Sequence, residues 1–333
     1  MSVIDCHLDI SRHISILSGT RYHPVSEQVV KEEGQMRVVR MRVARLVMAV
    51  VVAAGACVVA GVGSASAAPA VAVPAAGGIN NTGCRPSAAH PNPVVLLHGL
   101  GATYYEDINV LQGWLAARGY CTFASTYGAY DGFPLVGGLR DIGESAAQIA
   151  ASITTVLKQT GAAKVDIVGH SEGAFQSLYV SKTQGITDQI DKVVAIAPPT
   201  HGTSFAGLYN LAYVFGQSER DTVDKALKTL GCPACSQLGT GGSAVATLND
   251  GPVAQPGIDY TVITSKFDEL VTPTETSFVR EPGVVNQYVQ DFCPFDPVGH
   301  IGEAYDTNVW NMVANGLEST PNRKFLCLAG SPG

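Results

Sequence analysis

The feature that most constrains this chain is a five-residue turn, Gly169-His170-Ser171-Glu172-Gly173, which directly follows the apolar segment 165–168. A G-x-S-x-G turn between a strand and a helix is a nucleophile elbow. The chain bends so sharply there that the serine takes a strained backbone conformation, which small flanking residues make sterically possible. Residues 174–180 contain no proline and are predicted to be helical. The turn therefore presents the Ser171 hydroxyl beyond the edge of a sheet, where a base and a carbonyl group can both reach it.

Short apolar runs and helical patterns alternate around this turn. The runs 165–169 and 193–197 are apolar except for Asp166, as is typical of parallel strands that helices cover on both faces. Apolar residues recur at helical spacing over 142–157. Further strands are predicted at 94–97, 121–126, 260–264 and 284–289, and further helices at 108–118 and 309–317. The alternation predicts an α/β fold with a doubly wound, mostly parallel sheet, and it makes an ordinary glycine-rich turn the weaker alternative for 169–173.

One long interval, residues 201–257, interrupts the alternation. It is too long for a plain crossover loop and contains an apolar stretch at 208–215. We predict a cap or lid inserted over the site. The alternative is an ordinary crossover helix with a long surface loop.

The first 67 residues are predicted to be a targeting segment. Four arginines at 37–45 precede an apolar run from Leu46 to Val62, and an A-x-A cleavage site ends at Ala67. We expect a signal peptide over 36–67, cleavage near Ala67 and a secreted protein. A retained membrane anchor is the alternative, although the run is shorter than the roughly 20 apolar residues of a span. Residues 1–35 lack signal character and are predicted to be a non-native upstream extension.

Cleavage would leave 266 residues, the length of one α/β domain with a full core. We predict a tail over 68–92 and a single catalytic domain over 93–333, acting as a monomer. This mature part has 14 basic and 23 acidic residues, a net charge of −9. Such a charge argues against nucleic acids as partners.

Six cysteines remain after residue 67, an even number that in an exported protein predicts three disulfides. Their positions suggest the pairs Cys84–Cys121, Cys232–Cys235 and Cys293–Cys327. Cys232-Pro-Ala-Cys235 could instead be a redox or zinc motif, but no second C-x-x-C or nearby histidine completes a metal site. We therefore expect no metal and no cofactor.

A serine hydroxyl needs a base to remove its proton, and the base needs a carboxylate that orients it and stabilises its charged form. In proteins with a nucleophile elbow, the catalytic residues follow one another along the chain in the order Ser, then Asp or Glu, then His. Of the five histidines beyond residue 67, three precede Ser171, and His201 precedes any acid at a strand end. His300, in a glycine-flanked loop after the last predicted strand, is the predicted base.

The carboxylate should follow the penultimate strand. Asp268 stands just past the predicted strand 260–264, whereas Asp259 lies at the wrong end of it. Glu269 and Asp296 are the alternatives. We predict Asp268.

A negatively charged reaction intermediate needs fixed N–H donors. The elbow offers the backbone N–H of Glu172, and the exit of the first strand, 98–101, offers that of Leu100. We predict these two groups as the oxyanion hole.

These motifs together carry a resemblance to a known family. VVLLHGLG at 94–101, GHSEG at 169–173, FDELVTP at 267–273 and Gly299-His300 resemble the secreted class 2 triacylglycerol lipases of the α/β-hydrolase superfamily. The resemblance covers nearly all of residues 84–327. It implies the α/β-hydrolase fold, the triad Ser171, Asp268 and His300, the oxyanion residues Leu100 and Glu172, and water as acyl acceptor. His201, in a segment that also matches, is expected to be a wall or hinge residue.

The leading hypothesis is a secreted serine esterase of lipase type that hydrolyses acylglycerols or similar carboxylic esters, with transient association with lipid interfaces. An extracellular acyltransferase, or a polyester or cutin hydrolase with an open groove, would use the same triad. A non-catalytic binding protein would be expected to have a broken triad or oxyanion loop, and neither is broken in this sequence.

Overall fold

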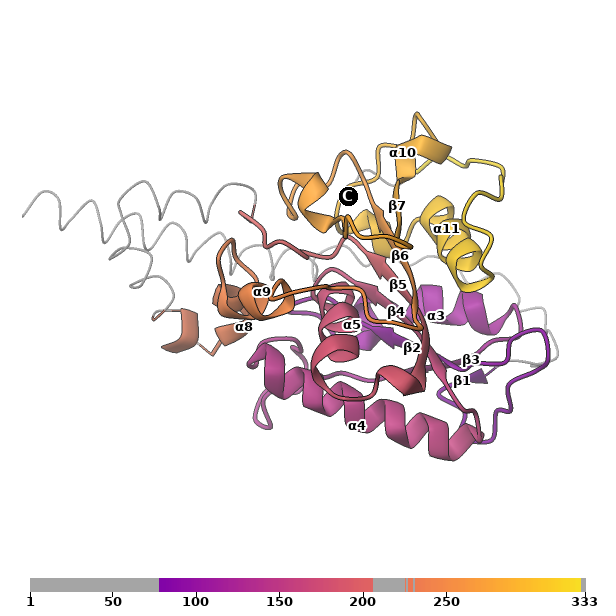
Figure 1. The fold of residues 1–333 in the computed structure, drawn as a ribbon, viewed down its shortest axis with the longest axis horizontal. Helices are drawn as coiled ribbons and strands as arrows, with labels where there is room; N and C mark the ends of the chain where they lie inside the picture. The colour runs from indigo at the N-terminus through magenta and orange to yellow at the C-terminus, as the bar shows by residue number, and fades with distance from the viewer. Residues whose placement is uncertain (1–77, 206–224, 226, 230, 331–333) are drawn as a thin grey trace, which may run out of the picture. The chain divides into compact units, whose positions relative to one another are not determined.

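The computed structural model describes residues 78–205, 225, 227–229 and 231–330. In this part of the chain seven strands form one sheet in the order β1-β3-β2-β4-β5-β6-β7, and all neighbours are parallel (Figure 1). The strands are β1 (Gly78–Ile79), β2 (Val94–Leu97), β3 (Cys121–Ala124), β4 (Val165–His170), β5 (Ile190–Ile196), β6 (Asp259–Thr264) and β7 (Val285–Tyr288). The predicted doubly wound parallel sheet is confirmed.

Helices cover both faces of the sheet, with α4 and α5 on one face and α3 and α11 on the other (Figure 1). The helices are α2 (Tyr104–Asp107), α3 (Asn109–Ala116), α4 (Ile142–Thr160), α5 (Glu172–Thr183), α8 (Pro233–Gln237), α9 (Ser243–Leu248), α10 (Val289–Phe292) and α11 (Thr307–Leu317). Short 3-10 turns are η2 (Thr187–Gln189), η3 (Thr274–Ser277) and η4 (Gly302–Ala304).

Strand β2 illustrates why the central strands are apolar without interruption. Successive side chains of a strand point to opposite faces. Val95 and Leu97 accordingly belong to the core beneath α4 and α5, whereas Val94 and Leu96 belong to the core beneath α3 and α11. Because both faces are covered, every position of the strand is buried.

The longest helix, α4, has clear end signals. The Asp141 side chain accepts hydrogen bonds from the N–H groups of Gly143 and Glu144, which caps the N-terminus. Gly161, with φ of 73°, ends the helix in the left-handed conformation that glycine adopts without steric cost. The helix therefore extends beyond the predicted end at residue 157.

The predicted N-terminal tail needs correction. Residues 78–79 form the edge strand β1, which pairs with β3, and Cys84 is buried and bonded to Cys121. The disulfide and the strand pairing hold this segment on the sheet, although its composition resembles that of an unpacked tail. Residues 68–77, the predicted signal peptide at 36–67 and the predicted extension at 1–35 lie outside the described residues.

All three predicted disulfides are present: Cys84–Cys121, Cys232–Cys235 and Cys293–Cys327. The C-x-x-C pair thus closes a short loop at the start of α8. No helix in the described ranges is both long and apolar enough to span a bilayer.

The apolar stretch 208–215 of the predicted cap lies outside the described residues, as do the rest of 206–224 and residues 226 and 230. The start of the insertion lies against residues 238–240, since the Thr203 N–H donates to the Leu238 carbonyl at 3.1 Å and the Thr240 N–H donates to the Thr203 carbonyl at 3.1 Å. The Thr203 hydroxyl also donates to the Leu270 carbonyl. The start of the insertion and residues 238–240 therefore lie beside the loop that follows β6.

The disulfides close loops of different length, which gives a test of their stabilising role. Cys84–Cys121 spans 37 positions and Cys232–Cys235 spans 3. Because a cross-link restricts the unfolded chain more when it closes a longer loop, the double variant Cys84→Ser/Cys121→Ser should lose about 3 kcal/mol of unfolding free energy. The matched variant Cys232→Ser/Cys235→Ser should lose less. Urea unfolding of both variants measures this, and equal losses would contradict it.

Candidate active site

The nucleophile elbow lies where β4 meets α5. Ser171 has φ of 55° and ψ of −120°, outside the usual range for a residue with a side chain. The flanking glycines make this possible. A Cβ on Gly169 would lie 2.2 Å from the Gly173 carbonyl oxygen, and a Cβ on Gly173 would lie 2.2 Å from the Leu97 carbonyl oxygen. Neither position can hold a larger residue without displacing backbone.

The structure brings the three residues of the predicted triad together. His300 Nε2 lies 2.8 Å from Ser171 Oγ, and His300 Nδ1 lies 2.8 Å from Asp268 Oδ2. Asp268 and His300 are both nearly inaccessible to solvent. An imidazole between a hydroxyl and a buried carboxylate can accept the hydroxyl proton while the carboxylate stabilises the resulting positive charge.

Backbone N–H groups hold the carboxylate in place. Asp268 Oδ1 accepts hydrogen bonds from the N–H groups of Leu270 and Val271, both at 2.8 Å. These bonds leave Oδ2 directed at His300.

The alternative acids occupy other positions. Glu269 Oε2 accepts a hydrogen bond from the backbone N–H of His300 at 3.1 Å, so it contacts the histidine's peptide rather than its ring. Asp296 accepts from the Val298 N–H and the Asn308 side chain. Asp259, the first residue of β6, lies at the opposite end of that strand from Asp268.

The predicted oxyanion residues flank the serine. Glu172 is the first residue of α5, where N–H groups have no partner within the helix. The loop 98–101 follows the neighbouring strand β2, and a Cβ on Gly99 would lie 3.2 Å from the Ser171 Cβ. On either side of Leu100, the Gly99 N–H donates to Asp107 and the Gly101 N–H donates to the Gly137 carbonyl. The Leu100 peptide is thus held between two anchors.

His98 and Tyr127 support this loop. Their rings stack at 4.3 Å, and the Tyr127 hydroxyl donates to the His98 carbonyl at 2.6 Å. Burial lowers the pKa of His98. The neutral ring then donates from Nδ1 to the Gly99 carbonyl and accepts the Tyr127 N–H at Nε2.

The structure contains a second aspartate–histidine pair, Asp107 and His170, and His170 directly precedes Ser171 in the chain. His170 Nδ1 lies 2.9 Å from Asp107 Oδ1, and both side chains are buried. Burial opposes ionisation of both groups, but their mutual attraction outweighs it, so the pKa of Asp107 is lowered and that of His170 is raised. Sequence reasoning assigned neither residue a role. The position of His170 inside the elbow motif was the only available signal.

The Glu172 side chain is a further unforeseen feature. It is fully buried, and Gln176 Nε2 donates to its Oε1 at 3.3 Å. Burial raises the pKa of Glu172 to about 8, so the carboxyl is mostly uncharged at neutral pH. Glu303 in η4 is also fully buried, and burial together with the nearby Asp268 raises its pKa well above the ordinary value.

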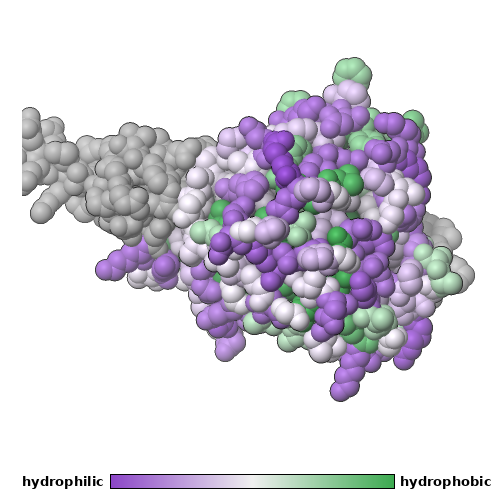
Figure 2. Space-filling model, viewed as in Figure 1, coloured by the Kyte–Doolittle hydropathy of each residue, from purple (hydrophilic) through white to green (hydrophobic). Residues whose placement is uncertain are grey.

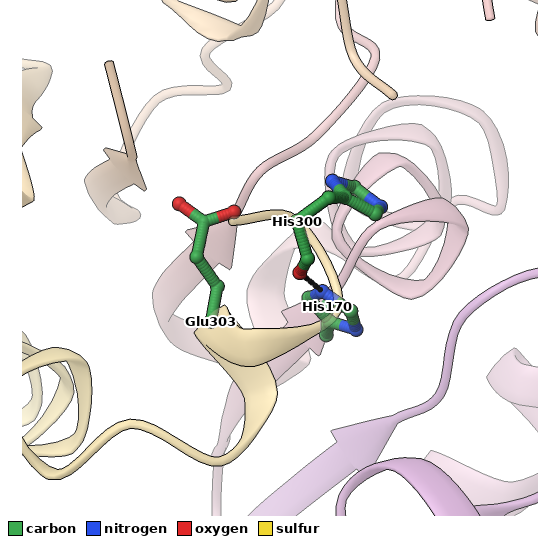
Figure 3. A group of neighbouring side chains, drawn as sticks. All are labelled: His170, His300 and Glu303. Atoms are coloured by element: carbon green, nitrogen blue, oxygen red, sulfur yellow. Dashed lines mark hydrogen bonds between the residues drawn. The ribbon is translucent and has the colours of Figure 1, made fainter. Parts of the chain in front are cut away.

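One group in the described part of the chain has the composition of a metal site. The ligand atoms of His170, His300 and Glu303 lie within 4.8 Å of one another (Figure 3). The ring nitrogens of both histidines already contact Asp107, the His300 carbonyl, Asp268 and Ser171. A metal ion would have to displace one of these contacts, so we assign no metal to the group.

His201, expected to be a wall or hinge residue, does not reach this site through its ring. Its Nε2 lies 3.0 Å from the Phe278 carbonyl oxygen, and its backbone N–H donates to the Thr276 carbonyl. It fastens the start of the insertion to η3 and the residue after it.

Comparison with known proteins identifies relatives of this chain. A family model described as Lipase (class 2) matches residues 91–309. A triacylglycerol lipase of Pseudomonas fragi is 30% identical over 138 residues, which cover 41% of this chain and 44% of that lipase. A triacylglycerol lipase of Pseudarthrobacter phenanthrenivorans is 34% identical over 125 residues, 36% of each chain. The chain thus matches less than half the length of these curated relatives.

Among solved structures, the fold is similar to that of Aspergillus fumigatus lipase B. The TM-score is 0.52 at 20% sequence identity, and the match covers 74% of this chain and 61% of the fungal one. At this identity the likeness supports the fold alone.

The buried Glu172 carboxyl should make stability depend on pH. Its folded-state pKa is raised from 4.5 to about 8, so the folded protein loses stability as pH rises through this range. The neutral isostere Glu172→Gln should therefore match the wild type at pH 5 and exceed it at pH 9 by on the order of a few kcal/mol. Chemical unfolding at both pH values measures the difference.

The matched control is Glu144→Gln, which changes an exposed glutamate of α4. It should give the same small difference at both pH values. A Glu172→Gln variant whose advantage does not grow with pH would contradict a neutral buried carboxyl.

Proposed function

Because the chain belongs to the class 2 lipase family, we propose that it is a secreted serine carboxylic-ester hydrolase that acts on acylglycerols or related esters. The observation that carries this proposal is the continuous contact from Ser171 Oγ through the His300 ring to Asp268, with 2.8 Å at each step. A buried relay of this kind serves to activate an alcohol as a nucleophile.

In the proposed reaction, Ser171 Oγ attacks the ester carbonyl carbon and passes its proton to His300 Nε2. Asp268 stabilises the imidazolium through Nδ1. The tetrahedral intermediate collapses when His300 donates the proton to the leaving alcohol, and an acyl-enzyme remains. A water molecule, deprotonated by His300, then attacks the acyl carbon. The bond from this carbon to Ser171 Oγ breaks, His300 returns the proton to Oγ, and the carboxylic acid is released.

The negative oxygen of each tetrahedral intermediate would be bound by the N–H groups of Leu100 and Glu172. The anchoring of the Gly99 and Gly101 N–H groups supports this proposal, because donors held in advance need no reorganisation during the reaction. The uncharged state of the Glu172 side chain also supports it, since a carboxylate there would oppose the developing charge.

Apolar side chains beside the triad favour an apolar substrate. Phe267 precedes Asp268 and is 56% exposed, and Ile301 follows His300 and is 47% exposed. On the face in Figure 2, hydrophilic residues predominate and hydrophobic ones occur in small separate groups. These two exposed apolar side chains, next in the chain to triad residues, support an ester with an apolar acyl chain and the proposed transient contact with lipid interfaces.

The three disulfides support the proposed export, because disulfides persist in oxidising compartments. The predicted signal peptide over 36–67 would direct the protein there. We propose that the mature protein acts outside the cell as a monomer.

Ser171→Ala should abolish ester hydrolysis. Loss of the nucleophile removes the acyl-enzyme route, and kcat for a chromogenic ester should fall on the order of 10⁶-fold. The matched control is Ser177→Ala, which removes a buried hydroxyl of the same helix that donates to the Ala174 carbonyl. The control should retain activity. Substantial turnover by a folded Ser171→Ala protein would exclude the proposed nucleophile.

A second pair of variants tests which acid serves His300. Asp268→Asn should lower kcat by about 10⁴-fold, because the amide no longer holds the imidazole in the required tautomer. Glu269→Gln should lower kcat much less. Glu269 contacts the His300 backbone N–H rather than the ring, and the amide oxygen can still accept that hydrogen bond. Steady-state kinetics measures both values. The reverse ranking would assign the acid to Glu269.

A further inference from the structure

We propose that Asp107 and His170 form a positioning pair, which holds the base His300 and the oxyanion loop 98–101 in fixed relation to each other. This inference rests on the proposed ester hydrolysis. This pair is separate from Asp268 and His300, and its members touch neither substrate nor the reacting atoms. They act through the backbone of the loop 98–101 and of His300.

The pair bridges two segments that are far apart in the chain. Asp107 Oδ2 accepts the backbone N–H of Gly99 at 2.7 Å, next to the predicted oxyanion residue Leu100. His170 Nε2 donates to the backbone carbonyl of His300 at 3.0 Å, the bond drawn as a dashed line in Figure 3. Between these ends, His170 Nδ1 contacts both carboxylate oxygens of Asp107, at 2.9 and 3.0 Å.

The hydrogen-bond partners indicate the protonation state of His170. One ring nitrogen faces an aspartate that also accepts a backbone N–H, and the other faces a carbonyl oxygen. A carbonyl oxygen and a carboxylate are acceptors only, so both ring nitrogens must donate. His170 is thus an imidazolium, paired with the Asp107 carboxylate and removed from solvent.

The pair Asp107–His170 leaves the backbone of Gly99 little room to move. A Cβ on Gly99 would lie 3.2 Å from the Ser171 Cβ, 3.4 Å from Asp107 Oδ2 and 3.7 Å from His170 Nδ1. Asp107 and His170 are 7% and 2% exposed, so water competes little for their bonds.

At its other end the bridge completes a clamp on the His300 backbone. Glu269 Oε2 accepts the His300 N–H, and His170 Nε2 donates to the His300 carbonyl. The backbone on both sides of the His300 Cα is therefore held by side chains. Loss of either hydrogen bond to the His300 backbone would let the imidazole shift relative to Ser171 Oγ. Loss of the bond from the Gly99 N–H to Asp107 would let the oxyanion donors shift as well.

Such shifts should affect the transition state more than the bound substrate, because base and oxyanion donors act most strongly on groups that change during the reaction. A displacement of about 1 Å can cost on the order of 10²-fold in rate. The expected signature is a fall in kcat with little change in KM.

Two substitutions at residue 170 separate the two halves of the bridge. The amide nitrogen of His170→Gln occupies roughly the position of Nε2 and can still donate to the His300 carbonyl. The amide nitrogen of His170→Asn occupies roughly the position of Nδ1 and can donate only to Asp107. We expect His170→Asn to lower kcat about 10²-fold and His170→Gln to retain several times more activity.

Two substitutions at residue 107 test the negative charge of the carboxylate and its hydrogen bond to the Gly99 N–H. Asp107→Asn can accept the Gly99 N–H with its oxygen and donate to a neutral His170 with its nitrogen, whereas Asp107→Ala can do neither. Asp107→Asn should therefore restore most of the kcat that Asp107→Ala loses. The control is Asp166→Asn, a buried aspartate at the start of β4 that contacts Asn92 and lies outside this network; its kcat should be unchanged.

The kinetics should be accompanied by two other measurements. The affinity of an alkyl boronic acid, which forms a tetrahedral adduct on a serine, should fall in parallel with kcat. Nitrogen-15 NMR of histidine-labelled wild-type protein should show both His170 nitrogens protonated at pH 7, and Asp107→Ala should abolish this signature. Melting temperatures show how much of any loss reflects unfolding.

Equal kcat for folded His170→Asn and His170→Gln, or losses that only follow the folded fraction, would overturn the positioning pair. A neutral His170 in the wild type would do the same. A wild-type protein that hydrolyses no ester would contradict the proposed function instead, and the NMR signature would still decide whether the ion pair exists.

Discussion

The strained turn at Ser171 is the constraint on which the rest of the structure depends. A residue with a side chain at φ of 55° and ψ of −120° costs of order 1–3 kcal/mol, so the surroundings must enforce it. They do so through the contact of Gly169 with Gly173 and of Gly173 with Leu97, which packs the start of α5 against the neighbouring strand. The same packing brings the first N–H groups of α5 beside the loop after β2. The proposed nucleophile and the proposed oxyanion donors thus arise from one backbone arrangement.

Around this turn the protein buries several ionisable groups, and these groups differ in the partners that they contact. Asp268 contacts His300, and Asp107 contacts His170, so each carboxylate lies against an imidazole. Glu172 and Glu303 have no such partner, and burial raises the pKa of each. The result is a region in which two carboxylates lie against imidazoles, whereas burial favours the uncharged form of the other two acids. Low solvent access strengthens the remaining hydrogen bonds and makes each of them costly to lose.

The part of the chain that matches the family model, 91–309, contains the whole site, and the disulfides join flanking segments to it. Cys84 precedes the match and is bonded to Cys121 within it, and Cys327 follows the match and is bonded to Cys293 within it. The C-terminal segment is further held by Asn308, which exchanges hydrogen bonds with Leu328 and donates to Asp296. Asp296, an alternative acid by sequence, thus has a structural partner of its own. Closeness to His300 along the chain therefore does not place the Asp296 carboxylate at the His300 ring.

The sequence by itself determined the alternating elements, the elbow, the three cysteine pairs and the Ser–Asp–His order, because each follows from local pattern or from elimination among few candidates. The carboxyl ends of parallel strands lie at one edge of a sheet, so the sequence alone predicted that Ser171, Asp268 and His300 lie close together. Only the tertiary structure revealed that residues 78–79 join the sheet, that the Glu172 side chain is buried uncharged, and that Asp107 links Gly99 to His170. Asp107 and His170 are 63 positions apart, and His170 and the His300 carbonyl are 130 apart. No periodicity connects such residues, since their contact depends on how helices and loops pack after the sheet has formed.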